Sequence, residues 1–376
     1  MDQEVLKLMN GINAQYQKRR GKDPEAQFDV IQRLSKDYDQ RVTVWQSGSL
    51  TFDLASGRNG VPKGRVIEMY GPESGGKTTT AMLMIASIQR QEAKRALEEP
   101  GYTAKICAFI DAEHAFDPML AIEYGVDIDE MVLVDPETAE QAMDICEALV
   151  RSGRFAIIVV DSVAALVPAK IEESSMEQQT MAELARFMSK AMQKLVGPSY
   201  QKNTTLLFIN QIREKIGGYA PNGIVPTTTP GGRALKYYSS LRLEIKRGES
   251  IKQGNDIVGH QIKVRFIKNK IGMPYKEAEF KLLYGVGIDK ADEIGQLAIF
   301  GGIVRTSGGW IYYEDENGHQ IEINGVPMKF NGRAKLFDEI SVNPELARQL
   351  DARIRGNFDQ IEAPEIPLEE RNFDDK

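Results

Sequence analysis

The sequence predicts an α/β fold in which a mostly parallel, twisted sheet is flanked by helices. Eight short apolar runs alternate with helix-compatible stretches between residues 65 and 283, a pattern typical of parallel strands joined by crossover helices. This alternation indicates a largely parallel sheet with helices on both faces. With 376 residues, of which 42% are hydrophobic and 27% charged, the chain can form a large core with smaller appendages, which excludes a mainly disordered protein.

The elements of this core, assigned to residues 41–289, follow in order. The predicted strands comprise residues 65–70, 105–110, 131–134, 156–160, 205–210, 241–246, 262–267 and 278–283. Residues 1–40 precede them, and apolar side chains recur there at helical spacing. These are Val5, Leu8, Met9, Ile12 and Tyr16, and they predict an amphipathic helix that ends near Arg20.

The chain changes character after Asp289. Residues 309–323 alternate in polarity around Asn317-Gly318, a pair that favours a hairpin turn, and residues 334–355 are helical with a break near Pro344. These signals predict a small α+β domain over 290–357. The tail, 358–376, holds seven acidic and two basic residues in its last eighteen positions and is expected to be disordered.

Charge and cysteines restrict the functional classes only loosely. The formal net charge is −7, but the tail supplies most of it, so basic clusters elsewhere can still bind phosphates. No apolar run is long enough to span a membrane and the N-terminus lacks a signal-peptide pattern, so we expect a cytoplasmic protein without a membrane partner. Cys107 and Cys146 lie in apolar runs and are expected to be core residues rather than disulfide or metal ligands.

The segment GPESGGKT, residues 71–78, matches the phosphate-binding P-loop pattern and has the strand before it and the helix-compatible stretch after it that the pattern requires. Backbone amides of such a loop surround phosphate oxygens at a helix N-terminus. Lys77 would reach the terminal phosphates and Thr78 would bind Mg²⁺. The predicted nucleotide contacts are Gly71, Pro72, Glu73, Ser74, Gly75, Gly76, Lys77, Thr78 and Thr79.

Two further strands end in carboxylates. Asp161 follows the run 156–160, where a P-loop protein places a carboxylate beside the metal. Glu113 follows the run 105–110 and is positioned to orient the water that attacks the γ-phosphate. For His114 we expect packing or hydrogen bonding near the turn instead of catalysis.

Regular patterning is lost between Gln211 and Ala234, where glycines, prolines and threonines are bracketed by basic residues. A structureless loop of about twenty residues inside a compact domain is uncommon and is usually functional.

Six segments of the core, taken in order, resemble the bacterial RecA recombinase family. They are GSLTFDLASG…GVPKGRVIEMYGPESGGKTT, FIDAEHAFDP, IIVVDSVAALVP, INQIREKIG, TTPGGRALKYYSS and VRFIKNKIGMP. The resemblance is close from Val42 to Asp289 and looser in the C-terminal domain. It implies a RecA-type P-loop ATPase core in an ATP- and Mg²⁺-dependent protein that polymerises on single-stranded DNA.

The resemblance also implies roles for residues outside the P-loop. Asp117 and Tyr284 match positions near the adenine, and Gln211 matches a sensor of the γ-phosphate. Lys268 and Lys270 match lysines that reach the γ-phosphate bound by the neighbouring subunit, so they would complete the active site only in a filament.

Two DNA-binding loops are implied, at about 170–181 and 212–232. The matching contact positions are Met181, Arg186 and Ser189 for the first loop, and Arg213, Lys215, Ile216, Thr229, Gly231 and Gly232 for the second. Basic side chains there would contact phosphates, Ile216 would enter between bases, and the glycines would allow close approach of the backbone. For basic residues in general, a solvated surface is the commoner role.

Some positions depart from the family pattern. Leu120 stands where relatives place an aromatic over the adenine, with Tyr124 one helical turn further on, and Gln193 stands at a basic DNA-contact position. GYAPNGIVP, residues 218–226, replaces a phenylalanine-containing run. The N-terminal segment hardly matches, although residues 28–35 could pair with the next protomer, as expected of an oligomerisation segment within 1–40.

The sequence therefore predicts a DNA-dependent ATPase that forms a helical filament on single-stranded DNA and exchanges strands with homologous duplex DNA in recombination and repair. A hexameric helicase or a regulatory ATPase on the same core is the alternative. A non-catalytic filament former is a third possibility, against which Lys77, Thr78, Glu113 and Asp161 argue. The acidic tail is either a solubilising terminus or an arm that competes with DNA for basic surface.

Overall fold

The computed structural model describes residues 3–20, 42–169, 179–214 and 227–358, together with Ile361, Ala363, Glu365 and Pro367. Several expectations concern residues outside this part of the chain. They are the strand at 28–35, most of the first DNA loop, the middle of the second loop with Lys215 and Ile216, and most of the acidic tail.

A nine-stranded sheet forms the centre of the molecule, in the order β13-β12-β11-β10-β3-β7-β6-β4-β5. Its parallel part comprises β3 (Val66–Gly71), β4 (Ile106–Asp111), β5 (Met131–Val134), β6 (Phe155–Asp161), β7 (Thr205–Gln211) and β10 (Leu241–Gln253). β11 (Asp256–Asn269), β12 (Glu277–Leu283) and β13 (Gly287–Ile288) extend it antiparallel. The expected α/β class and the eight expected strands are confirmed. The sheet is mostly and not entirely parallel because β11, β12 and β13 run antiparallel to their neighbours.

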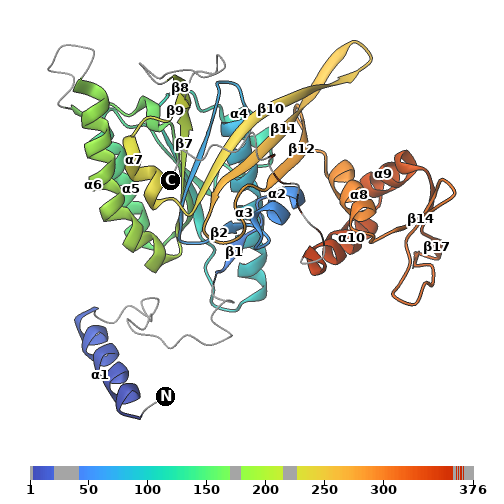
Figure 1. The fold of residues 1–376 in the computed structure, drawn as a ribbon, viewed down its shortest axis with the longest axis horizontal. Coiled ribbons are helices and arrows are strands. Elements are labelled where there is room, and N and C mark those ends of the chain that lie inside the picture. Colours follow the sequence, from blue (N-terminus) through green and yellow to red (C-terminus); the bar gives the residue numbers. More distant parts are fainter. Residues whose placement is uncertain are drawn as a thin grey trace.

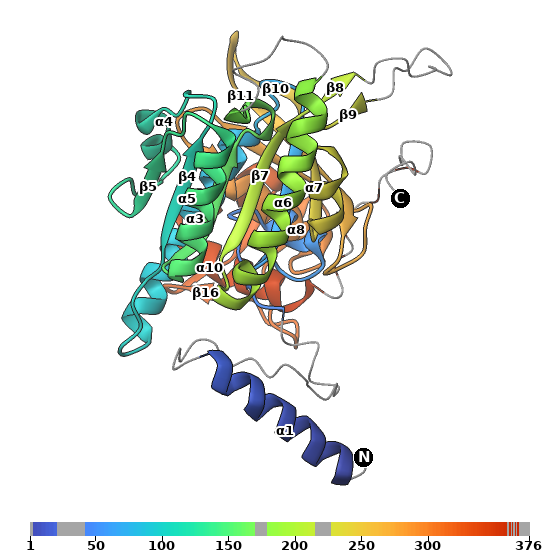
Figure 2. The ribbon, with the colours of Figure 1, turned by 90° about the vertical axis from the view of Figure 1, so that its left-hand side faces the viewer.

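Helices cover both faces of this sheet, as Figures 1 and 2 show. α3 (Lys77–Glu98) packs on one face with α2 (Leu50–Ser56), while α5 (Ala139–Ser152), α6 (Gln179–Lys202) and α7 (Gly232–Tyr238) pack on the other. Alternate strand residues serve the two cores: Ile157 of β6 lies in the α3 core, and its neighbour Ile158 lies in the α5–α6 core. Burial on both faces explains why β6 and β7 are almost continuously apolar, whereas β10, β11 and β12 alternate with charged residues.

Short elements complete the core. β1 (Val44–Trp45) pairs with β2 (Val61–Pro62), and α4 (Pro118–Glu123) follows β4. The 3-10 helix η3 (Val163–Ala165) follows β6. β8 (Arg213–Glu214) pairs with β9 (Thr227–Thr228), so the irregular segment after β7 returns to its starting point. Regular structure here was not expected, because two-residue strands are too short to produce a period.

The C-terminal region follows α8 (Lys290–Phe300) and lies to one side of the core in Figure 1. It contains β14 (Arg305–Ser307), β15 (Trp310–Tyr312), β16 (Glu322–Ile323), β17 (Val326–Pro327), β18 (Lys329–Asn331), α9 (Arg333–Val342) and α10 (Pro344–Gly356). The helix break at Pro344 is confirmed. At the predicted hairpin the chain does reverse, but only Glu314 and Gln320 pair across the turn.

Buried polar contacts fasten this region to α2. The carboxylate of Glu293 in α8 accepts hydrogen bonds from the Ser49 hydroxyl at 2.5 Å and the Thr51 amide at 3.0 Å. Arg355 of α10 donates to Asp53 Oδ2 at 2.9 Å, and burial raises the pKa of Asp53 to about 6 despite this guanidinium. Both buried carboxylates are thus hydrogen-bonded, and these bonds offset the free-energy cost of removing the carboxylates from water.

Candidate functional site

The P-loop joins β3 to α3, and its shape depends on glycines at both ends. A Cβ on Gly71 would lie 2.1 Å from the carbonyl oxygen of Ile245. Gly76 precedes α3 with φ of 89°, a conformation that glycine adopts without strain. Pro72, Glu73 and Ser74 are exposed between them. The loop therefore presents backbone amides and the N-terminus of a 22-residue helix to solvent, a suitable arrangement for an anion.

Lys77 folds back over this loop. Its ammonium group donates to the carbonyl oxygens of Gly71 at 3.2 Å and Pro72 at 2.7 Å. Burial lowers the pKa of Lys77, and the nearby carboxylates of Asp161 and Glu113 oppose that shift. A phosphate group would offer this ammonium a stronger partner than two carbonyls, since hydrogen bonds between charged groups are about twice as strong.

Thr78 and Asp161 meet at the start of α3. The Thr78 hydroxyl donates to Asp161 Oδ2 at 2.6 Å. Burial raises the pKa of Asp161 to about 6, with Glu113 and Asp111 adding to the shift. The carboxylates of Asp161, Glu113 and Glu73 all act on the single ammonium of Lys77, so the oxygen ligands and the excess negative charge fit a divalent cation such as Mg²⁺.

Glu113 connects three strands at their carboxyl ends. Ser162, directly after β6, donates its hydroxyl to Glu113 Oε1, and Gln211 at the end of β7 donates its side-chain amide to the same oxygen at 3.0 Å. Glu113 itself is exposed after β4. The structure therefore brings Glu113 and Gln211 together, although 98 residues separate them. His114 points elsewhere and contacts the Asp135 carboxylate.

Asn210 extends this network to the second predicted DNA loop. Its side-chain amide donates to Glu68 at 3.1 Å and to the carbonyl oxygen of Pro230 at 3.0 Å. Glu68 is fully buried and accepts from Arg242 Nε at 2.6 Å. The chain on both sides of the irregular segment is thus held against β7, beside Gln211.

The predicted DNA-contact residues that the structure describes lie on the α6–α7 side of the sheet. Arg213 and Arg186 are exposed, Ser189 is half-buried, and the Thr229 side chain is buried. Gly231 and Gly232 begin α7 and lie against α6, where a Cβ on Gly232 would come within 2.6 Å of Ala185. Met181 lies in the first turn of α6. The α6 positions and the glycines of the second loop therefore form neighbouring surfaces.

Lys268 and Lys270 lie apart from the P-loop of their own chain. Both ammonium groups donate to carbonyl oxygens at the C-terminus of α7, Lys268 to Lys236 at 2.5 Å and Lys270 to Tyr237 at 3.1 Å. Burial and the neighbouring Lys270 lower the pKa of Lys268 to about 8. Cations at a helix C-terminus are stabilised by its partial negative charge. Neither lysine belongs to the nucleotide site of the single chain.

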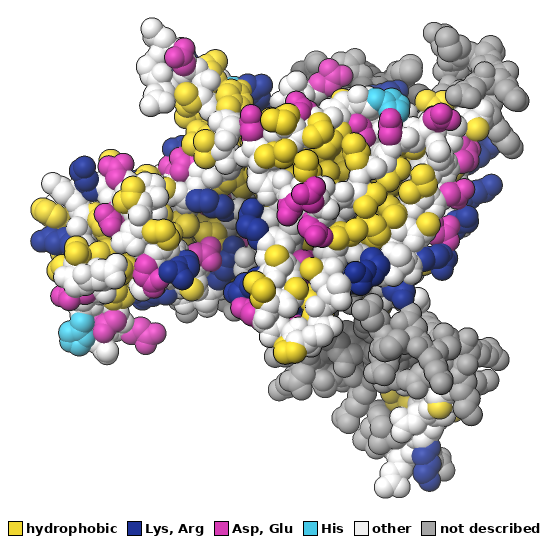
Figure 3. All heavy atoms as spheres, turned by 180° about the vertical axis from the view of Figure 1, so that it is seen from behind, with side chains coloured by type: hydrophobic (Ala, Val, Ile, Leu, Met, Phe, Trp, Pro, Cys, Tyr) yellow, Lys and Arg dark blue, Asp and Glu magenta, His cyan; other side chains and the backbone are white. Residues whose placement is uncertain are grey.

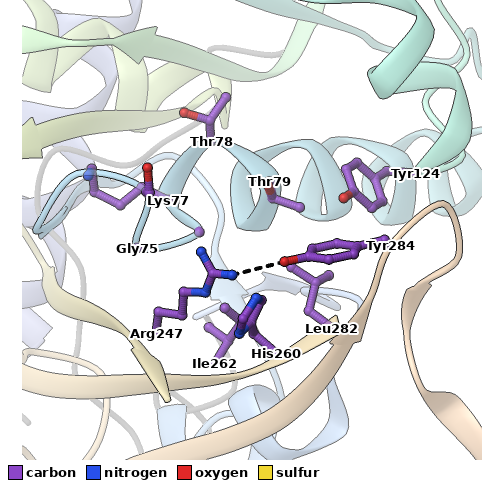
Figure 4. A pocket seen from close by; sticks show the side chains of 12 residues that line it. Gly75, Lys77, Thr78, Thr79, Tyr124, Arg247, His260, Ile262, Leu282 and Tyr284 are labelled. Atoms are coloured by element: carbon purple, nitrogen blue, oxygen red, sulfur yellow. Dashed lines mark hydrogen bonds between the residues drawn. The ribbon is translucent and has the colours of Figure 1, made fainter. Parts of the chain in front are cut away.

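A hollow of about 210 Å³ adjoins the P-loop (Figure 4). It is lined by Ser74, Gly75, Gly76, Lys77, Thr78, Thr79, Tyr124, Arg247, His260, Ile262, Leu282 and Tyr284. Tyr284 was expected here. Asp117 is not among the lining residues: it caps α4, where its carboxylate accepts the amides of Met119 and Leu120. Leu120 does not line the hollow either, whereas Tyr124 does.

The sequence reasoning missed Arg247, His260, Ile262 and Leu282. They come from β10, β11 and β12, an antiparallel part of the sheet that folds over the P-loop. Alternation along these strands indicates which residues share a face but not what that face covers. No local motif identifies them.

Comparisons with known proteins agree with this geometry. A family model described as the RecA N-terminal domain matches residues 14–289. Protein RecA of Halalkalibacterium halodurans is 44% identical over 350 residues, which is 92% of this chain and 92% of that protein. Protein RecA of Macrococcus caseolyticus is 43% identical over 355 residues, or 92% of this chain and 93% of that protein. In the part of the chain described by the structure, no helix is both long and apolar enough to cross a membrane.

Proposed function

Because the chain belongs to the RecA family, we propose that its residues couple ATP hydrolysis to polymerisation on single-stranded DNA and to exchange with homologous duplex DNA. The general activity follows from the family itself: the protein is an ATP-dependent DNA recombinase of recombination and repair, and a DNA-dependent ATPase. The proposal concerns which residues carry out each step.

In the nucleotide site, the P-loop residues from Gly71 to Thr79 hold the phosphates of ATP, and Lys77 exchanges its two carbonyl partners for phosphate oxygens. Thr78 and Asp161 would hold Mg²⁺, which would supply positive charge beside the phosphates. Among the described residues, no three acidic, histidine or cysteine side chains could hold a metal by themselves. Phosphate and water oxygens therefore supply the remaining ligands. Tyr284 contacts the adenosine, and Asp117 lies near it as the cap of α4.

Glu113 orients the attacking water and accepts its proton, and Gln211 carries the coupling to DNA. The observation on which this rests is the 3.0 Å hydrogen bond between Gln211 and Glu113, at the point where β7 leads into the second DNA loop. A γ-phosphate beside Glu113 would compete for the amide of Gln211 and thereby favour another arrangement of the loop. ATP then acts as a switch: its γ-phosphate stabilises the DNA-binding state, and hydrolysis releases it.

Assembly completes the site. Lys268 and Lys270 contact the γ-phosphate held by a neighbouring copy and neutralise charge as arginine fingers do elsewhere. Exposed hydrophobic side chains also gather over α4 and the sheet edge at β5 on the face seen in Figure 3. Met119, Ile122 and Leu133 are among the exposed residues there. Such a surface beside an edge strand supports contact with another copy of the chain in a helical filament.

DNA lies along the α6–α7 side. Arg186 and Arg213 contact phosphates, as does Lys215 in the part of the loop that the structure does not describe, where Ile216 enters between bases. Ser189 is half-buried on α6, Met181 belongs to the first turn of the same helix, and the backbone of Thr229, Gly231 and Gly232 approaches the strand closely. Because phosphate contacts dominate such binding, affinity should fall steeply with salt.

A strand-exchange assay with Mg²⁺, ATP or a slowly hydrolysed analogue, and single-stranded DNA tests this function, with electron microscopy of the same samples. We expect helical filaments and a product joined to homologous but not to unrelated duplex DNA. Closed rings that unwind duplexes without pairing them would favour the helicase alternative. Filaments without ATP hydrolysis would indicate a scaffold.

A further inference from the structure

His260 is a buried polar side chain whose ring nitrogens are both unsatisfied. The residue is 6% exposed, and neither Nδ1 nor Nε2 has a hydrogen-bond partner among the described residues. Burying a polar group without a hydrogen-bond partner is unfavourable, so such groups are uncommon and suggest a ligand. Nothing in the P-loop chemistry uses this side chain.

The position of His260 relative to the P-loop follows from the strand that carries it. Ile262 of β11 packs directly on the loop, since a Cβ on Gly76 would lie 2.8 Å from Ile262 Cδ1. His260 is two residues earlier on the same face of the strand, which places it about 7 Å further along the hollow. A nucleoside attached to phosphates in the P-loop extends over a distance of this order. His260 therefore lies at the base end of the site.

The neighbours of His260 do not hydrogen-bond to its buried ring nitrogens. Tyr284 presents its ring edge-on at a centroid distance of 5.5 Å, and Arg247 donates to the Tyr284 hydroxyl at 2.9 Å. Figure 4 shows His260 beneath this hydrogen bond, facing the same hollow as Tyr124. Burial and the Arg247 charge lower the pKa of His260. The neutral imidazole at physiological pH has one nitrogen that accepts and one that donates.

We propose that His260 is a specificity-determining residue that accepts a hydrogen bond from the 6-amino group of the purine base of ATP. This deepens the proposed function, on which it rests. A residue that binds the base edge also accounts for a site that lacks an aromatic at Leu120, because recognition moves from stacking to a hydrogen bond. Tyr124 and Tyr284 then supply the apolar contact surface on either side.

The test compares ATP with purine riboside 5′-triphosphate, which lacks only the 6-amino group. Dissociation constants are measured by calorimetry with Mg²⁺ on the full chain, its His260→Leu and His260→Gln variants, and His319→Leu as a control for an exposed histidine. We expect the wild-type chain to bind ATP about tenfold more tightly than the analogue, because the analogue leaves a buried acceptor unpaired. His260→Leu should reduce this preference to within about twofold, mainly by weakening ATP.

His260→Gln, which retains an acceptor oxygen, should recover part of the preference, and the control should keep all of it. A His260→Leu variant that keeps the tenfold preference, or that weakens both nucleotides equally, would show that the histidine only packs. A wild-type chain that binds both nucleotides equally overturns the inference alone, while one that binds neither overturns the proposed function as well.

Discussion

The nucleotide hollow has a phosphate end at the P-loop and a base end near His260 and Tyr284. The two ends differ in how many of their polar side chains already form hydrogen bonds within the protein. At the phosphate end, Lys77, Thr78, Asp161, Glu113 and Gln211 all hydrogen-bond to one another or to the loop. At the base end, neither ring nitrogen of His260 has a hydrogen-bond partner among the described residues, and Tyr284, whose hydroxyl accepts from Arg247, is 49% exposed.

This difference indicates what ATP must do at each end. Binding at the phosphate end replaces existing hydrogen bonds, so it can change the conformation of groups linked to them, including the loop after Gln211. Binding at the base end can add a hydrogen bond to His260, whose ring nitrogens have no partner among the described residues, so it can select the ligand without breaking an existing contact of that side chain. The phosphate end is suited to switching and the base end to recognition.

The largest expected effect is at the phosphate end. Glu113→Gln should lower ATP turnover by about 10²- to 10⁴-fold, because an amide cannot accept the proton of the attacking water. ATP and DNA binding should persist, since the amide can still accept from Ser162 and Gln211. Steady-state hydrolysis with single-stranded DNA measures this, with Glu98→Gln on the surface of α3 as control. Unchanged turnover would remove Glu113 from the mechanism.

Asp161 tests how much the buried carboxylate of the nucleotide site destabilises the folded protein when ATP is not bound. Its pKa of about 6 in the folded protein lies above the unfolded value, so its contribution to stability falls as pH rises from about 4 to about 6. Asp161→Asn should therefore raise the free energy of unfolding at pH 7 by about 1–3 kcal/mol, and by little below about pH 4.

Urea denaturation without nucleotide or Mg²⁺ measures this change, with exposed Asp129→Asn as the matched control. A lower stability of Asp161→Asn at pH 7 would mean that the hydrogen bond from Thr78 outweighs the burial of the charge.

Gln211 tests whether the phosphate end communicates with the DNA loop. Gln211→Ala should reduce the ratio of ATP turnover with single-stranded DNA to turnover without it by about tenfold. This factor corresponds to the free energy of one hydrogen bond to a charged group. The ratio is the informative measurement, because a general loss of activity would lower both rates. Gln253→Ala, at the exposed end of β10, is the control, and an unaltered ratio in Gln211→Ala would contradict the coupling.

The smallest effect is expected at the base end. Tyr284→Phe removes the hydroxyl that accepts from Arg247, and because both side chains are exposed, ATP affinity should change by less than about threefold. Calorimetric titration measures this, with the exposed Tyr200→Phe as control. A loss of tenfold or more would place the hydroxyl in contact with the nucleotide and weaken the distinction between the two ends.

Much of the phosphate end could be predicted from the sequence. The P-loop follows from its motif, and Asp161 and Glu113 follow from their places after apolar runs, because the residue after a parallel strand lies at the carboxyl edge of the sheet. The role of Gln211 follows only from the family resemblance. The hydrogen bonds among these residues could not be predicted, because the order of the strands in the sheet differs from their order in the sequence.

The base end and the C-terminal contacts were less predictable for physical reasons. Arg247 and His260 reach the hollow through an antiparallel pair with bulges, including one between Arg247 and Ser250, which change the register without a local signal. Asp53 and Arg355 form their ion pair across 302 residues. On a short helix, the local sequence around a buried acidic residue is indistinguishable from that around an exposed one, so its burial cannot be predicted before its partner is known.

The coupling of ATP to DNA is tested most directly by one measurement: ATP turnover by the wild-type chain at saturating Mg²⁺ and ATP, with and without single-stranded DNA. If ATP hydrolysis is coupled to DNA binding, single-stranded DNA stimulates turnover strongly, and this stimulation declines steeply as salt weakens the phosphate contacts. Equal turnover in both conditions would contradict it.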